Sequence, residues 1–386
     1  MNVCRRSLAV VLGCIFAVLL CLCAGCVSTP ETPTEDAKTI TVTDAFGREV
    51  TIHDNPQKIA VSGSGSMRYF VYLDVDLDRI VAVDYQDSSL FSRSNELRHY
   101  LLANPEIKNR QELGSAMAVV DNEKLLASGA EVLFMGGASS SQVEVADEIT
   151  AKTGVPVVMF YTGDYVTKGD EIRKTLRMLG TILHEEERAE EIIAYFASIE
   201  EDIKTRVANV SETDKPTVYV CGISYNGAHG ADGTDPTYLP FTLLGAENVA
   251  AGIGDISQTG YAKVAKEQIL AWDPDIIFVD LGTLTAAEGG ALVELWNDPA
   301  YQELSAVKNG TVYTVNPHTS MNVNHETSLA NAYYDGKVLY PEQFADIDPA
   351  EKADEIYEFV VGAPVFDLLN ANVNNLSYQK VEIPLP

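Results

Sequence analysis

The sequence predicts an α/β protein of two similar lobes with mainly parallel sheets, joined by one long α-helix. Three observations carry this prediction. Short apolar runs alternate with helical stretches, one segment recurs in each half, and an unbroken helical pattern lies between the halves. The 386 residues are enough for two lobes of roughly 100–200 residues each.

The predicted strands are short runs rich in β-branched residues, as expected for strands buried in a parallel sheet. They fall in the first half at 58–62, 79–84, 131–136 and 156–161, and in the second half at 217–222, 247–250, 275–280 and 311–315. Open α/β sheets bind ligands beyond the carboxyl ends of their strands. The loops that follow these runs are therefore the places where a ligand is expected.

A repeated segment supports the two lobes. Residues 120–127 and 264–271 each lead into a predicted strand, and the two segments align without a gap at an offset of 144 residues. Both have the pattern of a short helix, a turn and a strand, so each half is expected to form the same unit. Glu123 and Glu267 take the same position near the start of this helix, where the helix dipole favours an acid.

The segment 185–209 predicts the joining helix. It contains no Gly or Pro, and its apolar residues recur at helical spacing at Ile192, Ile193, Phe196, Ile199 and Ile203. As one helix it would span roughly 35 Å, at about 1.5 Å per residue. Such a connection leaves little freedom for a wide hinge.

The start of the chain predicts export. Arg5 and Arg6 precede an uncharged, mainly apolar run, and Ala24 and Gly25 stand directly before Cys26. This pattern resembles a bacterial or archaeal lipobox, in which the cysteine thiol is lipidated and becomes the new N-terminus. A plain anchor helix with an incidental Cys26 and a cytoplasmic protein are the alternatives.

The remaining boundaries follow from these signals. Residues 1–26 form the signal peptide with its lipobox, and residues 27–38, rich in Pro, Thr and acids, form a flexible tether. The N-terminal lobe is expected at 39–165, a helical region with the bridging helix at 166–210, the C-terminal lobe at 216–370 and a tail at 371–386.

The formal net charge of −29 argues against a nucleic-acid partner. If Cys26 carries lipid, Cys221 has no partner cysteine in the mature chain, so no disulfide framework is expected.

Several stretches together resemble the substrate-binding proteins of iron-chelate, haem and cobalamin ABC importers. They are the segments 43–48 and 56–59, the two repeated helices, and the segments 225–230, 241–249 and 332–341. The resemblance covers roughly residues 39–370 and implies two α/β lobes bridged by a long helix, with the ligand between them. It also implies that the ligand is an iron complex (siderophore, haem or corrinoid) carried as cargo, with no intrinsic cofactor.

The same resemblance implies the partners and the location. One exposed Glu on each lobe, here Glu123 and Glu267, would meet basic residues of the two membrane subunits of the importer. With lipid on Cys26, the protein would be extracytoplasmic and anchored to the outer face of the cytoplasmic membrane.

In the first lobe, the Gly/Ser loop 62–68 offers hydroxyl and main-chain N–H groups to an anion, and Arg68 offers a bidentate contact to a carboxylate. Tyr85, Tyr161 and Tyr165 follow strands and are candidates for stacking on a flat macrocycle. Each also has a plain structural interpretation, as a turn, rim or core residue.

In the second lobe, Tyr225 and His229 stand on a Gly-rich loop at a strand end, and both are tentative iron ligands. His318 and His325 lie in the loop after the last strand and are further candidates for ligand contact. Capping, turn or helix-start roles are the structural alternatives for all of them.

Two other functions remain open from the sequence. One is a receptor for a bare metal ion, held by His229, His318, His325 and Glu326. The other is a secreted hydrolase with Ser224 or Ser64 as nucleophile beside His229, although the segment 222–226 lacks the final glycine of a nucleophile elbow. The sequence as a whole favours a binding protein that is not an enzyme.

Overall fold

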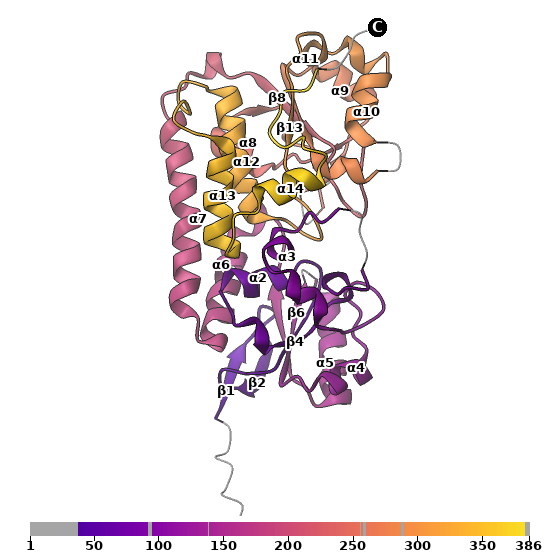
Figure 1. The fold of residues 1–386 in the computed structure, drawn as a ribbon, viewed down its shortest axis with the longest axis vertical. Helices are drawn as coiled ribbons and strands as arrows, with labels where there is room; N and C mark the ends of the chain where they lie inside the picture. The colour runs from indigo at the N-terminus through magenta and orange to yellow at the C-terminus, as the bar shows by residue number, and fades with distance from the viewer. Residues whose placement is uncertain are drawn as a thin grey trace, which may run out of the picture. The chain divides into compact units, whose positions relative to one another are not determined.

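In the computed structural model, which describes residues 38–91, 95–137, 139–254, 256–257, 260–286 and 289–382, the N-terminal lobe is built on a five-stranded parallel sheet (Figure 1). The strand order is β5-β4-β3-β6-β7. The strands are β3 (Ile59–Ser62), β4 (Ile80–Val83), β5 (Gln111–Glu112), β6 (Val132–Gly137) and β7 (Val157–Tyr161). The four strands predicted in this half are confirmed to within one residue at each end.

Short helices surround this sheet: α2 (Met67–Tyr72), α3 (His99–Ala103), α4 (Asn122–Ser128) and α5 (Val143–Thr153). An antiparallel hairpin of β1 (Thr39–Thr43) and β2 (Glu49–His53) precedes it. The sequence prediction missed this hairpin because exposed threonines and charged residues alternate with its few apolar positions. It also missed β5, whose two residues are too short for any pattern.

The bridging helix is α7 (Glu186–Val207), within the predicted range 185–209. It runs along the side of both lobes in Figure 1. All five residues of the predicted apolar stripe are buried in it. A second long helix, α6 (Tyr165–Leu183), comes before it and packs against it. The chain reverses between them at His184, which takes the left-handed conformation with a φ of 61°.

The C-terminal lobe contains a four-stranded parallel sheet of order β10-β8-β12-β13. Its strands are β8 (Thr217–Cys221), β10 (Glu247–Asn248), β12 (Ile276–Asp280) and β13 (Val312–Val315). All four predicted strands are present, although β10 is shorter than the run 247–250. A small antiparallel pair, β9 (Gly233–Thr234) with β11 (Ala262–Lys263), adds to the lobe.

The helices of this lobe are α8 (Leu239–Leu244), α9 (Lys266–Trp272), α10 (Gly290–Asn297), α11 (Ser305–Lys308), α12 (His325–Leu339), α13 (Pro349–Val361) and α14 (Phe366–Asn372). The repeat of the sequence is also a repeat of structure. Helix α4 and strand β6 of the first lobe begin at 122 and 132, and α9 and β12 of the second begin at 266 and 276, so both pairs keep the offset of 144.

The last helices return to the first lobe. Helix α13 packs against α2 and α3, and α14 packs against α3. One apolar cluster accordingly contains Phe70 and Val132 of the N-terminal lobe, Phe196 of α7 and Phe278 of the C-terminal lobe, all at most 2% exposed. Among the described helices, none is both long enough and apolar enough to cross a membrane. The predicted signal peptide, Cys26 and nearly all of the tether lie outside the described residues.

Candidate ligand cavity between the lobes

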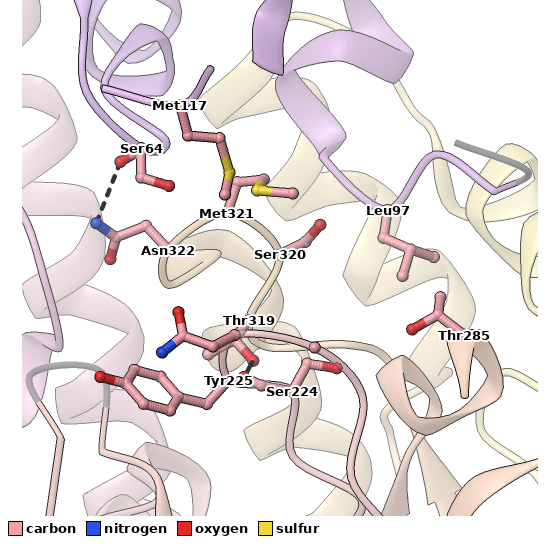
Figure 2. Close-up of a pocket in the computed structure, with 12 residues that line it drawn as sticks. Ser64, Leu97, Met117, Ser224, Tyr225, Thr285, Thr319, Ser320, Met321 and Asn322 are labelled. Atoms are coloured by element: carbon pink, nitrogen blue, oxygen red, sulfur yellow. Dashed lines mark hydrogen bonds between the residues drawn. The ribbon is translucent and has the colours of Figure 1, made fainter. Parts of the chain in front are cut away.

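Loops from both lobes enclose a cavity of about 390 Å³ (Figure 2). The N-terminal lobe contributes the loop after β3 and two later loops, and the C-terminal lobe contributes the loops after β8, β12 and β13. Twelve residues line it: Ser64, Leu97, Met117, Ser224, Tyr225, Asn226, Gly227, Thr285, Thr319, Ser320, Met321 and Asn322. The cavity therefore lies where the carboxyl ends of the strands predict a ligand.

The polar part of the lining is made of hydroxyl and amide groups, several of which already have protein partners. Ser64 Oγ donates to Gln86 Oε1 at 3.1 Å, and Thr285 Oγ1 donates to the carbonyl oxygen of Gly282 at 2.9 Å. Thr319 Oγ1 donates to the carbonyl oxygen of Ser224 at 2.9 Å. A hydroxyl has one proton and two lone pairs, so these three oxygens keep acceptor capacity toward the cavity.

The apolar part of the lining consists of Leu97, Met117 and Met321. Leu97 and Met117 come from the N-terminal lobe and Met321 from the C-terminal lobe, and both methionines extend along the same side of the cavity in Figure 2. Methionine is flexible and polarisable, so such side chains adapt to ligands of varied shape. The cavity thus offers one surface for hydrogen bonds and another for hydrocarbon.

Met321 lies at the tip of a tight turn after β13. The turn is closed by a bridge between Thr319 and Val323 and by a hydrogen bond from Ser320 N to Asn322 O at 2.9 Å. Met321 and Asn322 have φ values of 53° and 102°, which residues other than glycine rarely adopt. Such backbone strain persists where the surroundings fix it, and it is concentrated at functional sites.

Contacts with the N-terminal lobe hold this turn in place. Asn322 Nδ2 donates to the carbonyl oxygen of Ser64 at 3.3 Å, as Figure 2 shows. Gly65 has a φ of +65°, and a Cβ atom there would lie 2.2 Å from the carbonyl oxygen of Met321. Only glycine lets the two loops approach this closely.

Arg68, a predicted ligand residue, lies beneath the cavity and is not part of its lining. Its side chain is 1% exposed and donates to the carbonyl oxygens of Gly65, Ser320 and Val323. These three partners belong to the loops that bear Ser64 and Met321. Arg68 therefore positions the lining loops of both lobes. A bidentate contact to a ligand carboxylate would break the hydrogen bonds that hold these loops.

His318 is buried directly before the lining residue Thr319. Its Nδ1 lies 3.0 Å from Asp280 Oδ2, and its Nε2 lies 3.4 Å from Asp235 Oδ2. Burial by itself lowers the pKa of His318, but the hydrogen bonds and charges of the two aspartates raise it to about 10. The imidazole is therefore protonated at neutral pH, with Nδ1 hydrogen-bonded to Asp280 and Nε2 in an ion-pair contact with Asp235.

His325 and its neighbour Glu326 are buried at the start of α12, also away from the lining. His325 lies beside Tyr69 and Tyr165, and burial together with the charge of Arg68 lowers its pKa to about 3. Glu326 accepts a hydrogen bond from Tyr72 and lies 3.3 Å from His99. Burial alone would raise the pKa of Glu326, but His99 and Arg68 lower it to about 2.

Tyr225 is the one predicted ligand residue among the twelve that line the cavity. Its ring stacks on Tyr261, with centroids 5.1 Å apart and planes 16° apart. His229 contacts both members of this pair. Its Nε2 lies 2.7 Å from the carbonyl oxygen of Tyr225 and its Nδ1 lies 3.2 Å from the Tyr261 hydroxyl. The structure therefore brings Tyr225 and His229 together, with Tyr225 alone toward the cavity.

The other predicted aromatic residues have partners elsewhere. Tyr85 lies against Phe91, and Tyr161 lies against Phe46 with ring centroids 4.8 Å apart. Tyr165 begins α6 and its hydroxyl accepts a hydrogen bond from Arg173 at 2.8 Å. None of the three is among the residues that line the cavity.

Sequence reasoning missed most of the lining side chains while selecting several of the right loops. The Gly/Ser loop after β3 contains Ser64, and the loop after β13 contains Thr319 to Asn322. Leu97 and Met117 lie in irregular segments and Thr285 ends the 3-10 helix Leu281–Thr285, none of them within a motif. The sequence offers one signal for a lining residue, namely its position after a strand. This signal identifies the loop but does not tell which of its side chains point into the cavity.

Glu123 and Glu267 are exposed in the first turns of α4 and α9. Helix α4 is capped by Asp121, whose side chain accepts from the main-chain N–H groups of Glu123 and Lys124. Asp121 rather than Glu123 thus caps α4, and α9, whose N-cap residue is Ala265, has no side-chain cap. Within the described residues, no group of three or more His, Cys, Asp or Glu side chains is arranged to hold a metal ion.

The sequence profile of the periplasmic binding protein family matches residues 120–319. The molybdate-binding protein MolA of Haemophilus influenzae is 22% identical over 82% of this chain and 89% of its own length. The Fe(3+)-citrate-binding protein YfmC of Bacillus subtilis is 27% identical over 39% of this chain and 44% of its own. A solved periplasmic solute-binding protein from Veillonella parvula superimposes with a TM-score of 0.67 at 22% identity, over 88% of this chain and 99% of the other.

The match covers more than half of the chain, and the two parallel sheets with the interlobe cavity agree with it. These relatives are binding proteins, so the hydrolase alternative is wrong and the chain is not an enzyme. The chain belongs to the periplasmic binding protein family and is an extracytoplasmic solute-binding protein of an ABC importer.

Proposed function

We propose that this receptor captures a compact iron complex in the cavity between its lobes and delivers it to the membrane subunits of the importer. The observation that carries the proposal is the cavity itself, which loops of both lobes line at the ends of their strands. The names of two relatives support a metal-containing ligand with oxygen donors, because one is named as a molybdate-binding protein and the other as an Fe(3+)-citrate-binding protein.

The size of the cavity favours a small chelate over haem or a corrinoid. Its volume of about 390 Å³ lies near the lower end of the range for ligand pockets, roughly 300–1,000 Å³. A flat macrocycle is held by stacking between aromatic rings, and Tyr225 is the one aromatic residue among the described residues of the lining. Of the three ligand classes that the resemblance implied, a siderophore-type iron chelate therefore fits best.

The bare metal ion is less favoured because its candidate ligands have other partners. His318 is held between two carboxylates, and His325 is buried among tyrosines. Both nitrogens of His229 lie at hydrogen-bonding distance from Tyr225 and Tyr261. Recruiting His318 or His325 to a metal would leave buried partners without their present contacts, which costs about 1–3 kcal/mol for each such group.

Docking and anchoring complete the proposed delivery. Glu123 and Glu267 occupy equivalent exposed positions on the two lobes and are suited to meet basic residues of two similar membrane subunits. A lipid on Cys26, followed by the tether 27–38, would keep the receptor at the outer face of the cytoplasmic membrane. Ligand capture, docking and anchoring then use different parts of the chain.

A cavity-blocking variant tests the proposal. Met117→Trp places a large ring into the cavity from an exposed loop position, and Leu368→Trp makes a comparable change at the exposed surface of α14. Iron recovered with the receptor from its own host, and iron uptake by cells that depend on it, should fall at least about tenfold in Met117→Trp. Both should stay normal in Leu368→Trp. Equal iron loading of the two folded variants would contradict the proposed site.

A further inference from the structure

Among the residues that the structure describes, the side chains that line the cavity carry no formal charge. All twelve are serine, threonine, asparagine, glycine, tyrosine, leucine or methionine, and Figure 2 shows their hydroxyl, amide and thioether ends around the space. The chain around them has a formal net charge of −29. An anionic ligand would therefore enter a negative overall field and find no cationic side chain among the described lining residues.

The charged groups buried near the cavity do not make the electrostatic field at the cavity positive. The guanidinium of Arg68 is directed to three main-chain carbonyl oxygens of the lining loops. The imidazolium of His318 lies between two carboxylates, those of Asp235 and Asp280, so that group is negative as a whole. Asp164, 3% exposed, adds a third acid near Asp235.

Part of the lining presents hydrogen-bond acceptors to a ligand. The hydroxyl protons of Ser64, Thr285 and Thr319 are donated to protein oxygens, which leaves lone pairs for a ligand. The amide of Asn322 is also in use, because Nδ2 donates to Ser64 O and Oδ1 accepts from Val323 N. These groups present mainly acceptors, and Ser224, Tyr225 and Asn226 add hydroxyl and amide groups that can also donate. An oxyanion or a carboxylate would have to rely on those donors alone.

Leu97, Met117 and Met321 form the remaining part of the lining and have no polar group to offer beyond the weakly accepting thioether sulfur. A bare oxyanion would leave its oxygens against these side chains without hydrogen bonds. A ligand with an organic skeleton instead buries hydrocarbon there.

We propose that the ligand is an electrically neutral metal chelate whose organic framework carries N–H or O–H donors together with exposed hydrocarbon. This inference rests on the proposed function and specifies its cargo. The receptor would then bind neither a molybdate-type oxyanion nor an anionic carboxylate or catecholate complex as its preferred ligand.

Inert chromium(III) complexes test the inference, because they match the octahedral oxygen coordination of ferric chelates and stay intact in solution. The neutral tris(acetohydroxamato) complex carries N–H donors and methyl groups. The trianionic tris(oxalato) complex has neither, and molybdate supplies the bare oxyanion. Calorimetry with the mature folded receptor should give at least about tenfold tighter binding of the neutral complex than of either anion.

The N-methylated hydroxamate complex separates charge from hydrogen bonding, because it is also neutral but has lost the N–H donors. It should bind more weakly than the parent complex and still more tightly than the trisoxalate. Equal binding of the two hydroxamates would overturn the donor part of the inference.

Charge variants test the electrostatic part. Thr285→Lys places a cation on the lining, and Thr213→Lys makes the same change of net charge at an exposed position far along the chain, in the 3-10 segment Glu212–Asp214. Thr285→Lys should improve trisoxalate binding about tenfold or more, and Thr213→Lys should not.

The outcomes distinguish this inference from the proposed function. Preferential binding of trisoxalate or molybdate by the wild-type receptor would overturn the neutral ligand, while iron loading that depends on Met117 would still support the receptor. Failure of the folded receptor to bind the neutral complex would also overturn it. Iron loading of Met117→Trp equal to that of the wild type would instead contradict the proposed ligand site.

Discussion

The Nη2 atom of Arg68 in α2 lies 3.2 Å from the carbonyl oxygen of Ser320, in the loop that follows β13 of the other lobe. The same guanidinium reaches Val323 at the far side of the Met321 turn. The shape of the cavity therefore depends on a cation that does not itself line it. Arginine suits this position because its planar group keeps its charge and offers five donors in fixed directions.

Arg68→Met should destabilise the protein by about 2–5 kcal/mol, because three buried carbonyl oxygens and Glu326 lose a cationic neighbour. Urea unfolding of the mature chain measures this change. Arg110→Met is the control, since Arg110 pairs with Asp78, whose side chain is 90% exposed, and surface pairs contribute about 1 kcal/mol or less. Equal losses in the two variants would show that Arg68 is an ordinary surface arginine in its energetic effect.

The pH dependence of stability should contain a contribution from His318. Its folded-state pKa of about 10 lies above the unfolded value of 6.5, so the bound proton stabilises the fold. The contribution is complete below about pH 6.5 and is lost as the pH rises through about 10. His318→Gln should therefore be less stable by a few kcal/mol near neutral pH and should lose less stability than the wild type toward about pH 10.

Unfolding free energies across this pH range provide the measurement, with His184→Gln as a control at an exposed histidine. Parallel pH profiles of the wild type and His318→Gln would mean that His318 carries no proton in the folded state.

Reversing the charge of both Glu123 and Glu267 to arginine should abolish uptake and leave ligand affinity unchanged. Contacts at such exposed positions control the encounter and orientation of partners, and they weaken with salt. Glu187→Arg with Glu351→Arg is a matched control, because these residues also lie in the first turns of helices and give the same change of charge. Normal import by the Glu123/Glu267 variant would reduce both residues to features of helix design.

Cys26→Ser should give a precursor that is neither lipidated nor cleaved before residue 26. The reason is chemical, since the lipid is attached through the thiol and the serine hydroxyl does not replace it. Mass spectrometry of the mature N-terminus checks this prediction. An unmodified Cys26 in the mature wild-type protein would contradict the proposed anchor.

Tyr225→Ala should weaken ligand binding about tenfold, because it removes both a lining hydroxyl and the ring that covers one side of the cavity. His229→Ala alone should weaken it less, since the imidazole only supports the Tyr225–Tyr261 pair. Titration of the single and double variants with the same chelate tests this order. A larger loss in His229→Ala would assign the imidazole to direct ligand contact.

The fold could be predicted in detail where burial imposes a pattern on the sequence. Strands such as β6 and β12 are buried over nearly their whole length, so their apolar runs define them. The apolar stripe of α7 is likewise predictable because the buried face of the helix requires apolar residues at helical spacing. The hairpin β1–β2 escaped because six of its ten residues are exposed and its apolar residues only alternate with them, so it has no continuous apolar run like those of the buried strands.

The site could be predicted only to the level of loops. Arg68, His318 and His325 are rare polar residues near strand ends, and sequence reasoning assigned them to the ligand for that reason. In the folded chain they have protein partners, namely main-chain carbonyls, aspartates and tyrosines, which lie more than 30 positions away in sequence for most of these contacts. Such long-range pairing leaves no local pattern, whereas the actual lining consists of common serines, threonines and methionines.

The burial of the first turn of α12 against the N-terminal lobe has a consequence for how the chain can be divided. Glu326 accepts a hydrogen bond from Tyr72 and lies 3.3 Å from His99, and α13 packs on α2 and α3. The C-terminal half is therefore completed by residues that lie more than 220 positions earlier in the chain. A fragment beginning at residue 216 would expose a carboxylate and an apolar helix face that the whole chain buries. The two halves should therefore unfold in a single cooperative transition, and neither should be recovered as a stable fragment when it is expressed alone.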